Sequence, residues 1–344
     1  MRRYRIGLGA EVVLAFTWAA FAAPVGFAQP SNVRLLSQVP GHFFAVRVEG
    51  HYAYLSNEFR FRILDVSDPS SPVDRGSLDL YPDGVGGLDV TGSLAYLANG
   101  TGGLRIVDVT NPSSPTVRGS YHTAHYPGTV FTADGLAYLT EWAGGLEIVD
   151  VTNPTTPTLR GSYDTPDLAR DVFVSGGLAY VADRSSLQIL DVTNPSSPTL
   201  RGAYQDPSGA RICDVFVSGH IAYVTTTSGD DWTGHYARFL SLDVSNPAAP
   251  RLLGSYGTPG CGGGLYVSGD FAYVLLGYDL HILDISAPSF PRLRGFHPVD
   301  GAAEGWGRIV ASGGLVYIAV IDPGFMILEF TPPPLAANRW QLYR

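Results

Sequence analysis

Short apolar segments alternate with turn-forming residues along most of this chain. In one stretch the four apolar segments are residues 171–175, 178–182, 187–192 and 199–204. Gly176-Gly177 separates the first two segments and can adopt the positive φ of a tight hairpin. The Asn-Pro-Ser-Ser-Pro sequence at residues 194–198 forms a turn and is incompatible with helix. Segments this short, separated by such turns, predict the strands of a sandwich, a barrel or a propeller.

The unit of four segments recurs seven times. One tyrosine marks the same place in every copy, and its successive steps are 42, 42, 42, 43, 50 and 44 residues. These tyrosines are Tyr54, Tyr96, Tyr138, Tyr180, Tyr223, Tyr273 and Tyr317. A period of this size with four strands per unit is typical of a β-propeller. We therefore expect an all-β fold in which residues 29–330 form a seven-bladed β-propeller of four-stranded antiparallel blades.

The order of the units predicts how the ring closes. Residues 33–38 match the last strand of a unit, yet they precede the first complete hairpin, and the final unit stops at residues 325–330 without such a strand. We expect residues 33–38 to become the outer strand of the last blade, because this pairing removes an open seam. Residues 331–344 begin with Thr-Pro-Pro-Pro and are expected to form an exposed, proline-rich C-terminal tail.

Residues 1–28 have the pattern of a signal peptide. Three arginines lie within the first five residues, and a mainly apolar stretch follows at residues 12–27. Gly26 and Ala28 supply the small residues that a signal peptidase reads, so we expect cleavage after Ala28, with cleavage after Ala22 as the alternative. The mature protein is therefore expected to be secreted, periplasmic or held at the cell surface. No later segment of the sequence is long and apolar enough to span a membrane.

Composition narrows the chemistry further. The formal net charge of −9, with no visible basic patch, argues against a nucleic-acid partner. All 22 basic residues are arginine, which excludes lysine nucleophiles and Schiff-base chemistry. Cys213 and Cys261 precede the same strand in consecutive units, and an oxidising compartment permits a disulfide between them. Two partly buried thiols are the alternative interpretation.

The repeated segment Leu-x-Ile-Val-Asp-Val-Thr-Asn-Pro-Ser-Ser-Pro resembles the LVIVD-repeat family of exported bacterial and archaeal proteins. The segments that carry the resemblance are residues 104–108, 146–150, 187–191 and 281–284, and the match extends over roughly residues 33–330. The equivalent segments at residues 240–243 and 326–329 depart slightly from the motif. The resemblance implies a β-propeller, often associated with the cell surface, with no established biochemical activity.

Repetition within the chain separates scaffold from candidate function. A residue that every blade needs recurs seven times, whereas a site needs particular residues once. A carboxylate precedes the Asx-Pro turn in every unit, and we interpret it as an acceptor of backbone N–H groups in its own turn. These carboxylates are Asp65, Asp108, Asp150, Asp191, Asp243, Asp284 and Glu329. The repeated tyrosines and the Arg-Gly-Ser-Tyr segments are likewise assigned to packing.

The unrepeated residues gather on one face of the expected ring. The first strand of each blade lies nearest the axis. The loop that leads into this strand and the loop between the second and third strands open on the same side of the ring. We call this side the loop face. The second of these loops carries nine extra residues in the fifth unit. Three tryptophans with nearby charges form a candidate ligand surface. Its expected ligand-binding residues are Trp142, Arg211, Asp230, Asp231, Trp232, His235, Glu304 and Trp306.

The extended fifth loop also raises the question of a metal ion. Asp230 and Asp231 are carboxylates of the kind that calcium prefers, and His235 would suit zinc. Their spacing matches no recognised metal-binding motif, and a solvated loop is the alternative. We therefore expect no cofactor, with calcium as the metal to consider.

The inner strands supply a second candidate group. Asp171 and Asp214 hold equivalent positions in neighbouring inner strands and could form an acid–base pair, assisted by His125 or His235. Alternatively, one of the nearby arginines neutralises them, the candidates being Arg170, Arg211 and Arg308. Arg47 and Asp89 also hold matching positions in adjacent units, which predicts an internal ion pair.

These observations favour a binding or interaction module. We expect the loop face to recognise a protein or glycan partner at the cell envelope, and the closed ring to be a monomer. A lyase or hydrolase built on the inner-strand carboxylates is one alternative, and a structural envelope component is another. No Gly-x-Ser-x-Gly elbow, phosphate loop or His-Glu-x-x-His motif is present.

Overall fold

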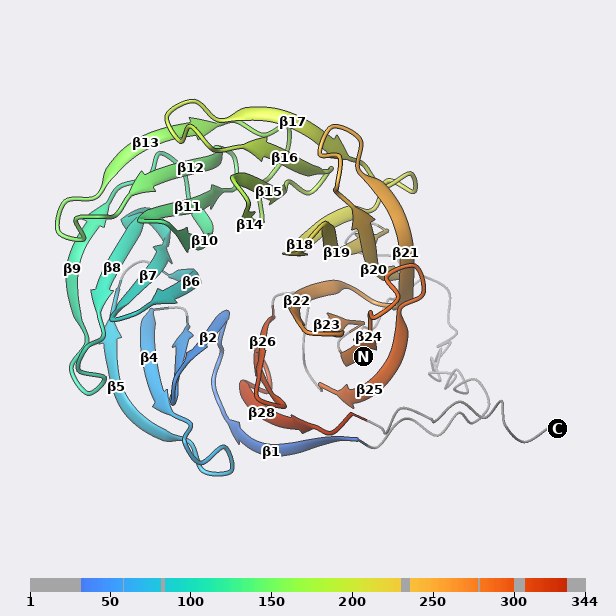
Figure 1. Ribbon diagram of the computed structural model, residues 1–344. Coiled ribbons are helices and arrows are strands. Elements are labelled where there is room, and N and C mark those ends of the chain that lie inside the picture. The colour runs from blue at the N-terminus through green and yellow to red at the C-terminus, as the bar shows by residue number, and fades with distance from the viewer. Residues whose placement is uncertain are drawn as a thin grey trace, which may run out of the picture.

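Seven four-stranded antiparallel sheets surround a central axis in the computed structural model (Figure 1). The structure describes residues 32–57, 59–81, 84–229, 236–277, 279–299 and 307–332. The expected signal peptide at residues 1–28 therefore lies outside the described residues, as does most of the expected tail. The predicted seven-bladed β-propeller is confirmed. None of the described residues belongs to a helix that is long and apolar enough to cross a membrane.

The blades follow one another in chain order, and each runs from its inner to its outer strand. Blade 1 contains β2 (Ala45–Glu49), β3 (Tyr52–Ser56), β4 (Arg60–Asp65) and β5 (Val73–Asp79). Blade 2 contains β6 (Val85–Thr91), β7 (Leu94–Asn99), β8 (Leu104–Asp108) and β9 (Thr116–Tyr121). Blade 3 contains β10 (Pro127–Ala133), β11 (Leu136–Glu141), β12 (Gly145–Asp150) and β13 (Thr158–Tyr163). Blade 4 contains β14 (Asp171–Ser175), β15 (Leu178–Ala182), β16 (Leu187–Asp191) and β17 (Thr199–Tyr204).

The remaining blades depart from this regular pattern. Blade 5 contains β18 (Arg211–Ser218), β19 (Ile221–Ser228), β20 (Tyr236–Asp243) and β21 (Arg251–Pro259). Blade 6 contains β22 (Gly262–Ser268), β23 (Phe271–Leu276), β24 (Asp279–Asp284) and β25 (Arg292–Pro298). Blade 7 contains β26 (Arg308–Ser312), β27 (Leu315–Ala319), β28 (Phe325–Phe330) and β1 (Val33–Val39). The insertion in blade 5 was predicted as loop, but part of it extends the hairpin, since β19 and β20 have eight residues each and their counterparts in blade 4 have five.

The N-terminal strand closes the ring, as predicted. β1 pairs antiparallel with β28, from Val33 opposite Phe330 to Val39 opposite Phe325. The hydroxyl of Ser37 donates to the carbonyl oxygen of Pro69 at 2.6 Å and so joins the last blade to the first. The two ends of the chain therefore hold each other in place, and no blade is left with an unpaired seam.

The repeated carboxylates stabilise the turns between the third and fourth strands. In six blades the aspartate accepts the backbone N–H two residues later, as Asp108 does from Thr110 at 2.9 Å. Glu329 is different and corrects the prediction for the last unit. In blade 7 the outer strand is β1, so β28 is paired with the N-terminal strand and not with a strand that follows it in the sequence. Glu329 instead forms an exposed ion pair with Arg34 at 2.9 Å.

The glycine of the Arg-Gly-Ser-Tyr segment and its equivalents pack each of blades 1 to 5 against the blade that follows. A Cβ atom added to Gly119 would clash with the carbonyl oxygen of Pro154, and one added to Gly161 would clash with that of Pro195. The same relationship holds at Gly76, Gly202 and Gly254, whose nearest neighbours are the carbonyl oxygens of Pro112, Pro247 and Pro288. The glycine segment and the proline turn, which both recur in the repeat, therefore contact each other across the blade boundary. This contact explains why the two segments recur together.

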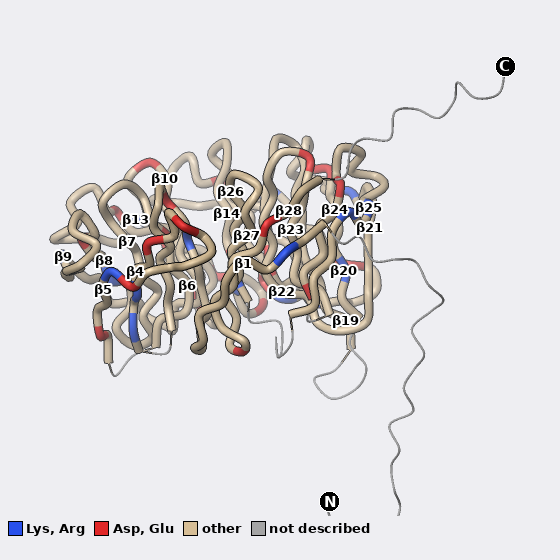
Figure 2. Tube along the Cα trace, turned by 90° about the horizontal axis from the view of Figure 1, so that it is seen from below, with Lys and Arg blue, Asp and Glu red and all other residues tan. Residues whose placement is uncertain are grey.

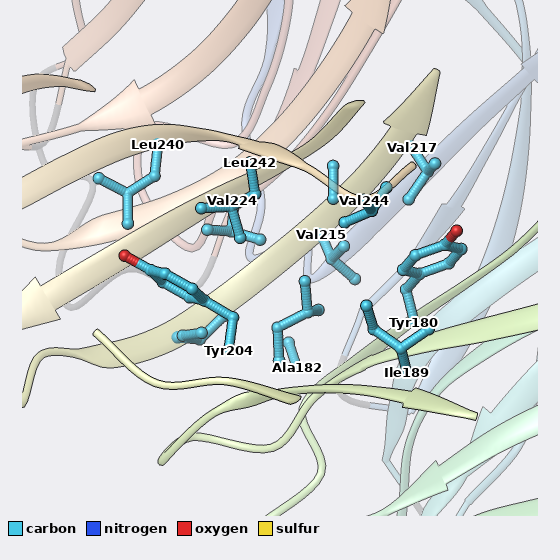
Figure 3. Packing of buried hydrophobic residues seen from close by; sticks show 13 residues of the cluster. Tyr180, Ala182, Ile189, Tyr204, Val215, Val217, Val224, Leu240, Leu242 and Val244 are labelled. Carbon is cyan, nitrogen blue, oxygen red and sulfur yellow. The ribbon is translucent and has the colours of Figure 1, made fainter. Parts of the chain in front are cut away.

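The hydrophobic core lies between neighbouring blades rather than at one centre. Between blades 4 and 5, Tyr180 and Ile189 pack against Val215, Val217 and other buried aliphatic side chains (Figure 3). All seven repeated tyrosines are buried, with at most 6% of their surface exposed. The assignment of the repeated tyrosines to packing is thus confirmed. Seven such layers hold the inner strands rigidly around the axis.

Candidate functional site

A cavity of about 410 Å³ lies where the inner strands begin, on the loop face. It is lined by Phe44, Phe59, Gly84, Val85, Gly86, Gly87, Gly128, Trp142, Arg170, Cys213, Asp214, Gly263, Gly264, Gly307 and Arg308. These residues come from all seven blades, and blade 4 contributes Arg170, which directly precedes β14. We call this space the axial cavity.

Glycines form much of the cavity wall because the inner strands approach one another closely. A Cβ atom on Gly87 would lie 2.6 Å from the backbone of Thr129, and one on Gly264 would lie 2.5 Å from the carbonyl oxygen of Gly307. Side chains at these positions would separate the blades. The glycines also leave space at the axis and bring backbone groups to the cavity surface.

Asp214 and Arg308 line the axial cavity, and Arg308 also contacts Asp171, which is not among the lining residues. Arg308 of β26 contacts Asp171 of β14 at 3.0 Å and makes a short contact with Asp214 of β18. Asp171 also accepts the backbone N–H of Val215 at 3.2 Å. Burial, and next the charge of Asp171, raise the pKa of Asp214 well above its usual range. Arg308, one of the three arginines considered from the sequence, contacts both aspartates.

Aromatic side chains stand at the sides of the cavity. The indole of Trp142 lies against Gly128, where an added Cβ atom would be 3.0 Å from Nε1. The backbone N–H of Trp142 donates to the carbonyl oxygen of Tyr126 at 3.2 Å, so the turn after β11 is attached to the segment that leads into β10. Phe44 and Phe59 line the cavity from blade 1. Flat apolar surfaces and hydrogen-bonding groups thus face the same space.

The rim of the loop face carries exposed aromatic residues that sequence analysis missed. Tyr81 is 79% exposed, Tyr126 is 61% exposed, and Tyr236 and Phe59 are close to half exposed. Phe59 and Tyr81 contact each other with ring centroids 5.6 Å apart. Tyr81 and Tyr126 lie in loops leading into inner strands, Phe59 lies in the turn between β3 and β4, and Tyr236 begins β20. The sequence could have indicated these aromatic residues, because none of them recurs from unit to unit and their place in the repeat puts them on the loop face.

An arc of aromatic rings follows the charged group along the inner strands. Phe131, Phe173, Phe216 and Tyr266 stand two residues further along their strands than the level of Asp171, and consecutive centroids are 5.0, 4.7 and 5.3 Å apart. At the same level Arg47 binds Asp89 at 3.0 Å, which confirms the predicted ion pair. None of these residues lines the axial cavity.

A second buried acidic group lies behind Trp142. Glu141 ends β11, and Glu147 lies on the neighbouring strand β12; they are 1% and 7% exposed. Their side chains are hydrogen-bonded to each other, and Glu147 is also bonded to Tyr121 of blade 2. Burial, and next the charge of Glu147, raise the pKa of Glu141 to about 8. Sequence analysis did not identify Glu147.

The structure separates the other residues predicted from the sequence. Trp142 lines the axial cavity, whereas Arg211 is not among the described residues that do so. His125 lies beside the Glu141–Glu147 pair, because a Cβ atom on Gly144 would be 2.6 Å from its ring. The loop residues Asp230, Asp231, Trp232, His235, Glu304 and Trp306 lie outside the described residues.

The two cysteines are recorded as thiols and not as a disulfide, and both are partly buried. The thiol of Cys213 lies at the cavity wall and donates to the carbonyl oxygen of Arg211 at 3.6 Å. Within the described ranges, no group of three or more His, Cys, Asp or Glu residues is placed to hold a metal ion. In the side view of the described residues, acidic and basic positions occur on several blades (Figure 2).

Solved structures that resemble this chain are β-propellers or proteins of similar shape. The β-propeller domain of Myceliophteria thermophila Cps50 (Swd1) is 13% identical, with a TM-score of 0.68 over 87% of this chain and 100% of that chain. The computationally designed Ika8 protein is 10% identical, with a TM-score of 0.60 over 87% of this chain and 100% of that one. The N-terminal domain of Nup159 is 12% identical, with a TM-score of 0.58 over 87% and 96%. At these identities the likeness concerns the fold alone.

No curated protein matches the sequence. The LVIVD repeat, in contrast, matches seven consecutive segments of the chain. They are residues 40–79, 85–123, 130–165, 168–206, 210–258, 259–296 and 306–329. Each segment corresponds to one blade, and together they span most of the ring. The chain therefore belongs to the LVIVD repeat family.

Proposed function

We propose that this protein is an exported binding module that recognises a glycan chain at the cell envelope through its loop face. A propeller with these repeats is in general a scaffold for interactions, and the axial cavity is the observation that supports binding at the loop face. A cavity of about 410 Å³ accommodates one or two sugar rings. The signal-peptide pattern at residues 1–28 supports export.

Aromatic residues support a carbohydrate ligand. The C–H faces of a sugar ring stack on aromatic rings, and its hydroxyl groups hydrogen-bond to carboxylates, guanidinium groups and backbone amides. Trp142 offers such a ring inside the cavity, and Tyr81 and Tyr126 offer exposed rings at the rim. Because the blades are rigid, these rings lose little conformational entropy on binding.

The charges and sheet edges favour an uncharged glycan over a polypeptide. Arg308 is engaged with two aspartates, and beside the rim Arg60 binds Asp79 at 2.6 Å. Because these charges are already paired with each other, the groups around the cavity offer a ligand mainly hydrogen bonds and no net attraction for a charged group. A polypeptide that added a strand would need a free sheet edge, and the outer strands of the blades lie at the circumference of the ring, away from the axial cavity (Figure 1).

The proposal is tested by titration calorimetry with uncharged hexose and N-acetylhexosamine oligosaccharides. We expect Trp142→Ala and Tyr81→Ala to weaken binding by about tenfold each, the magnitude typical of a central aromatic contact. Phe290→Ala is the matched control, because Phe290 is 71% exposed but lies in the turn between β24 and β25, on the opposite face. Equal loss with Phe290→Ala, or binding of an envelope protein in place of every oligosaccharide, would contradict the proposed ligand.

A second candidate function is acid–base catalysis by Asp171 and Asp214. Asp214 lines the axial cavity, and its raised pKa favours a protonated carboxyl that could donate to a leaving group. The contacts of Arg308 with both carboxylates oppose this function, since they hold the side chains in place as an ion cluster. Oligosaccharide cleavage with a bell-shaped pH profile, abolished by Asp214→Asn, would favour the enzyme over the binding module.

A further inference from the structure

We infer that the Glu141–Glu147 pair is a proton-dependent latch that holds Trp142 in the wall of the axial cavity and releases it in alkaline medium. The latch is a structural device of this chain, and its effect on ligand affinity rests on the proposed function. Its working parts are the two carboxyl groups, the segment of residues 122–126 and the turn of residues 142–144.

The pair joins three elements that meet behind the cavity wall. Glu141 stands opposite Gly145, and Glu147 lies two residues beyond Gly145, so both side chains project from the same side of blade 3. Glu147 is hydrogen-bonded to Tyr121 at the end of β9 in blade 2. The carboxylate of Glu141 and the ring of His125, in the segment between β9 and β10, both lie against Gly144.

Trp142 is attached to the same segment. It follows Glu141 directly, and its backbone N–H donates to Tyr126 at 3.2 Å. The backbone N–H of Gly144 donates to the carbonyl oxygen of Glu141 at 3.0 Å, which closes the turn. The position of the indole against Gly128 therefore depends on how Glu141 is bonded.

A single shared proton makes this arrangement favourable. Two carboxylates in hydrogen-bond contact cannot both be ionised at low cost when both are buried. The titratable groups that face the pair are Tyr121 from β9 and His125 from the segment leading into β10. Burial, and next the charge of Glu147, raise the pKa of Tyr121 to about 12, so it remains a neutral donor. A positive charge on His125 would lower the pKa of Glu147, which is nevertheless raised by burial.

Loss of the shared proton to water leaves two repelling charges that must be rehydrated. β11 and β12 are paired along their length and resist separation. The segment of residues 122–126 and the turn of residues 142–144 lie at the surface of the loop face, where Tyr126 is 61% exposed. Movement there is the least costly way to admit water, and it carries Trp142 away from Gly128.

Other blades show that the acid pair is not a requirement of the repeat. At the positions of Glu141 and Glu147, blade 4 has Asp183 and Gln188, a pair with only one ionisable group. Gln188 donates to Ser186, and Asp183 accepts from the same serine. Blade 4 therefore shows that an acid and an amide fit this place. It also supplies the variant Glu147→Gln, which removes one charge while keeping a residue that the fold already uses.

The first test measures the latch without a ligand. Trp18, Trp232, Trp306 and Trp340 are replaced by Phe in the full chain, and the emission of Trp142 is followed from about pH 6 to about pH 9.5. We expect a red shift centred near the pKa of the pair, and its absence in Glu147→Gln. Asp183→Asn, the matched control in blade 4, should retain the shift. A constant emission maximum, or the same shift in Glu147→Gln, overturns the latch.

Two further measurements test the latch even if the Glu147→Gln variant does not fold. Glu141→Gln is the second variant and should also abolish the shift. In the unaltered protein, amide hydrogen exchange at Trp142 and Gly144 should accelerate above about pH 8 beyond the general effect of hydroxide, while exchange in blade 4 should not. Equal protection of both turns at alkaline pH contradicts the inference whatever the variants do.

The second test measures binding with the oligosaccharides used above. We expect affinity to fall by about tenfold between about pH 6.5 and about pH 9.5 in the wild type and to remain constant in Glu147→Gln. The two tests separate the two proposals. A Trp142 shift without oligosaccharide binding at any pH supports the latch and rejects the glycan ligand, whereas pH-independent binding supports the ligand and rejects the latch.

Discussion

The guanidinium group of Arg308 in blade 7 lies 3.0 Å from the carboxylate of Asp171 in blade 4, three blades away around the ring. It makes a still shorter contact with Asp214 in blade 5. Blade 6 has Gly264 at the equivalent level, so no side chain stands between Arg308 and the two aspartates. One arginine in the wall of the axial cavity therefore connects three blades.

Arg308→Ala should destabilise the protein strongly. The substitution leaves two buried carboxylates without their cation, which costs about 3–5 kcal/mol for a buried ion pair. Urea unfolding measures this change. Arg34→Ala is the control, because the Arg34–Glu329 pair has a similar distance of 2.9 Å but side chains that are 71% and 44% exposed. We expect less than about 1 kcal/mol there. An equal loss of unfolding free energy for the two substitutions would show that the ion pairs of Arg308 contribute no more than an exposed ion pair.

Deleting residues 29–39 should lower the thermal midpoint by on the order of 10 °C. The deletion removes β1, exposes the edge of β28 and breaks the Ser37–Pro69 hydrogen bond between the last blade and the first. Differential scanning calorimetry measures the shift. Deleting residues 333–344 is the control and should leave the midpoint unchanged. An unchanged midpoint after the first deletion would refute closure by the N-terminal strand.

The fold could be predicted from the sequence because its turn signals recur with the strands. The predicted strands at residues 171–175, 178–182 and 199–204 have the same bounds as β14, β15 and β17, since Gly-Gly and Asn-Pro segments end them sharply. The insertion in blade 5 has no such signals. Its Thr-rich residues continue the β19 ladder instead of leaving it, and alternation alone did not show where the strands end.

Site residues could be predicted from the sequence only where the repeat shows which positions of different blades lie at the same level. Counting from the repeated tyrosines placed Asp171, Asp214 and Arg308 at one level, and they meet there. Glu147 escaped notice because its position varies from blade to blade. The equivalent residues are Arg62, Arg105, Gln188, Leu240, His281 and Met326. Only the packing of β12 against Tyr121 of the preceding blade shows that the side chain is buried beside another acid.

Gly161→Ala should destabilise blade 3 against blade 4. The added methyl group would clash with the carbonyl oxygen of Pro195, a backbone atom in a turn that cannot move without shifting the blade. Overpacking of this kind costs about 1–3 kcal/mol, measurable by urea unfolding. Ser162→Ala, at the exposed neighbouring residue, should change stability by less than about 0.5 kcal/mol. A neutral Gly161→Ala would mean that the repeated glycine is not needed for blade packing.

A buried histidine links blades 5 and 6. His281 of β24 is 5% exposed, and its Nδ1 is 3.0 Å from the hydroxyl of Tyr256 in β21. Its ring also packs edge-on against Phe296, with centroids 5.2 Å apart. Burial lowers the pKa of His281 to about 4, so the folded protein keeps this imidazole neutral under mildly acidic conditions.

His281 should make stability fall as the medium is acidified. In the unfolded chain this histidine binds a proton below about pH 6.5, whereas in the folded protein it stays neutral until about pH 4. The free energy of unfolding therefore decreases as the pH falls through this window, by roughly 2–3 kcal/mol. His281→Met uses the residue that blade 7 has at the equivalent place, Met326, and removes the titrating group. Urea unfolding at several pH values should show a flatter profile for this variant below about pH 6.5. His220→Gln, at an exposed histidine, should keep the wild-type slope. The same slope in His281→Met and wild type would assign the acid sensitivity to other groups.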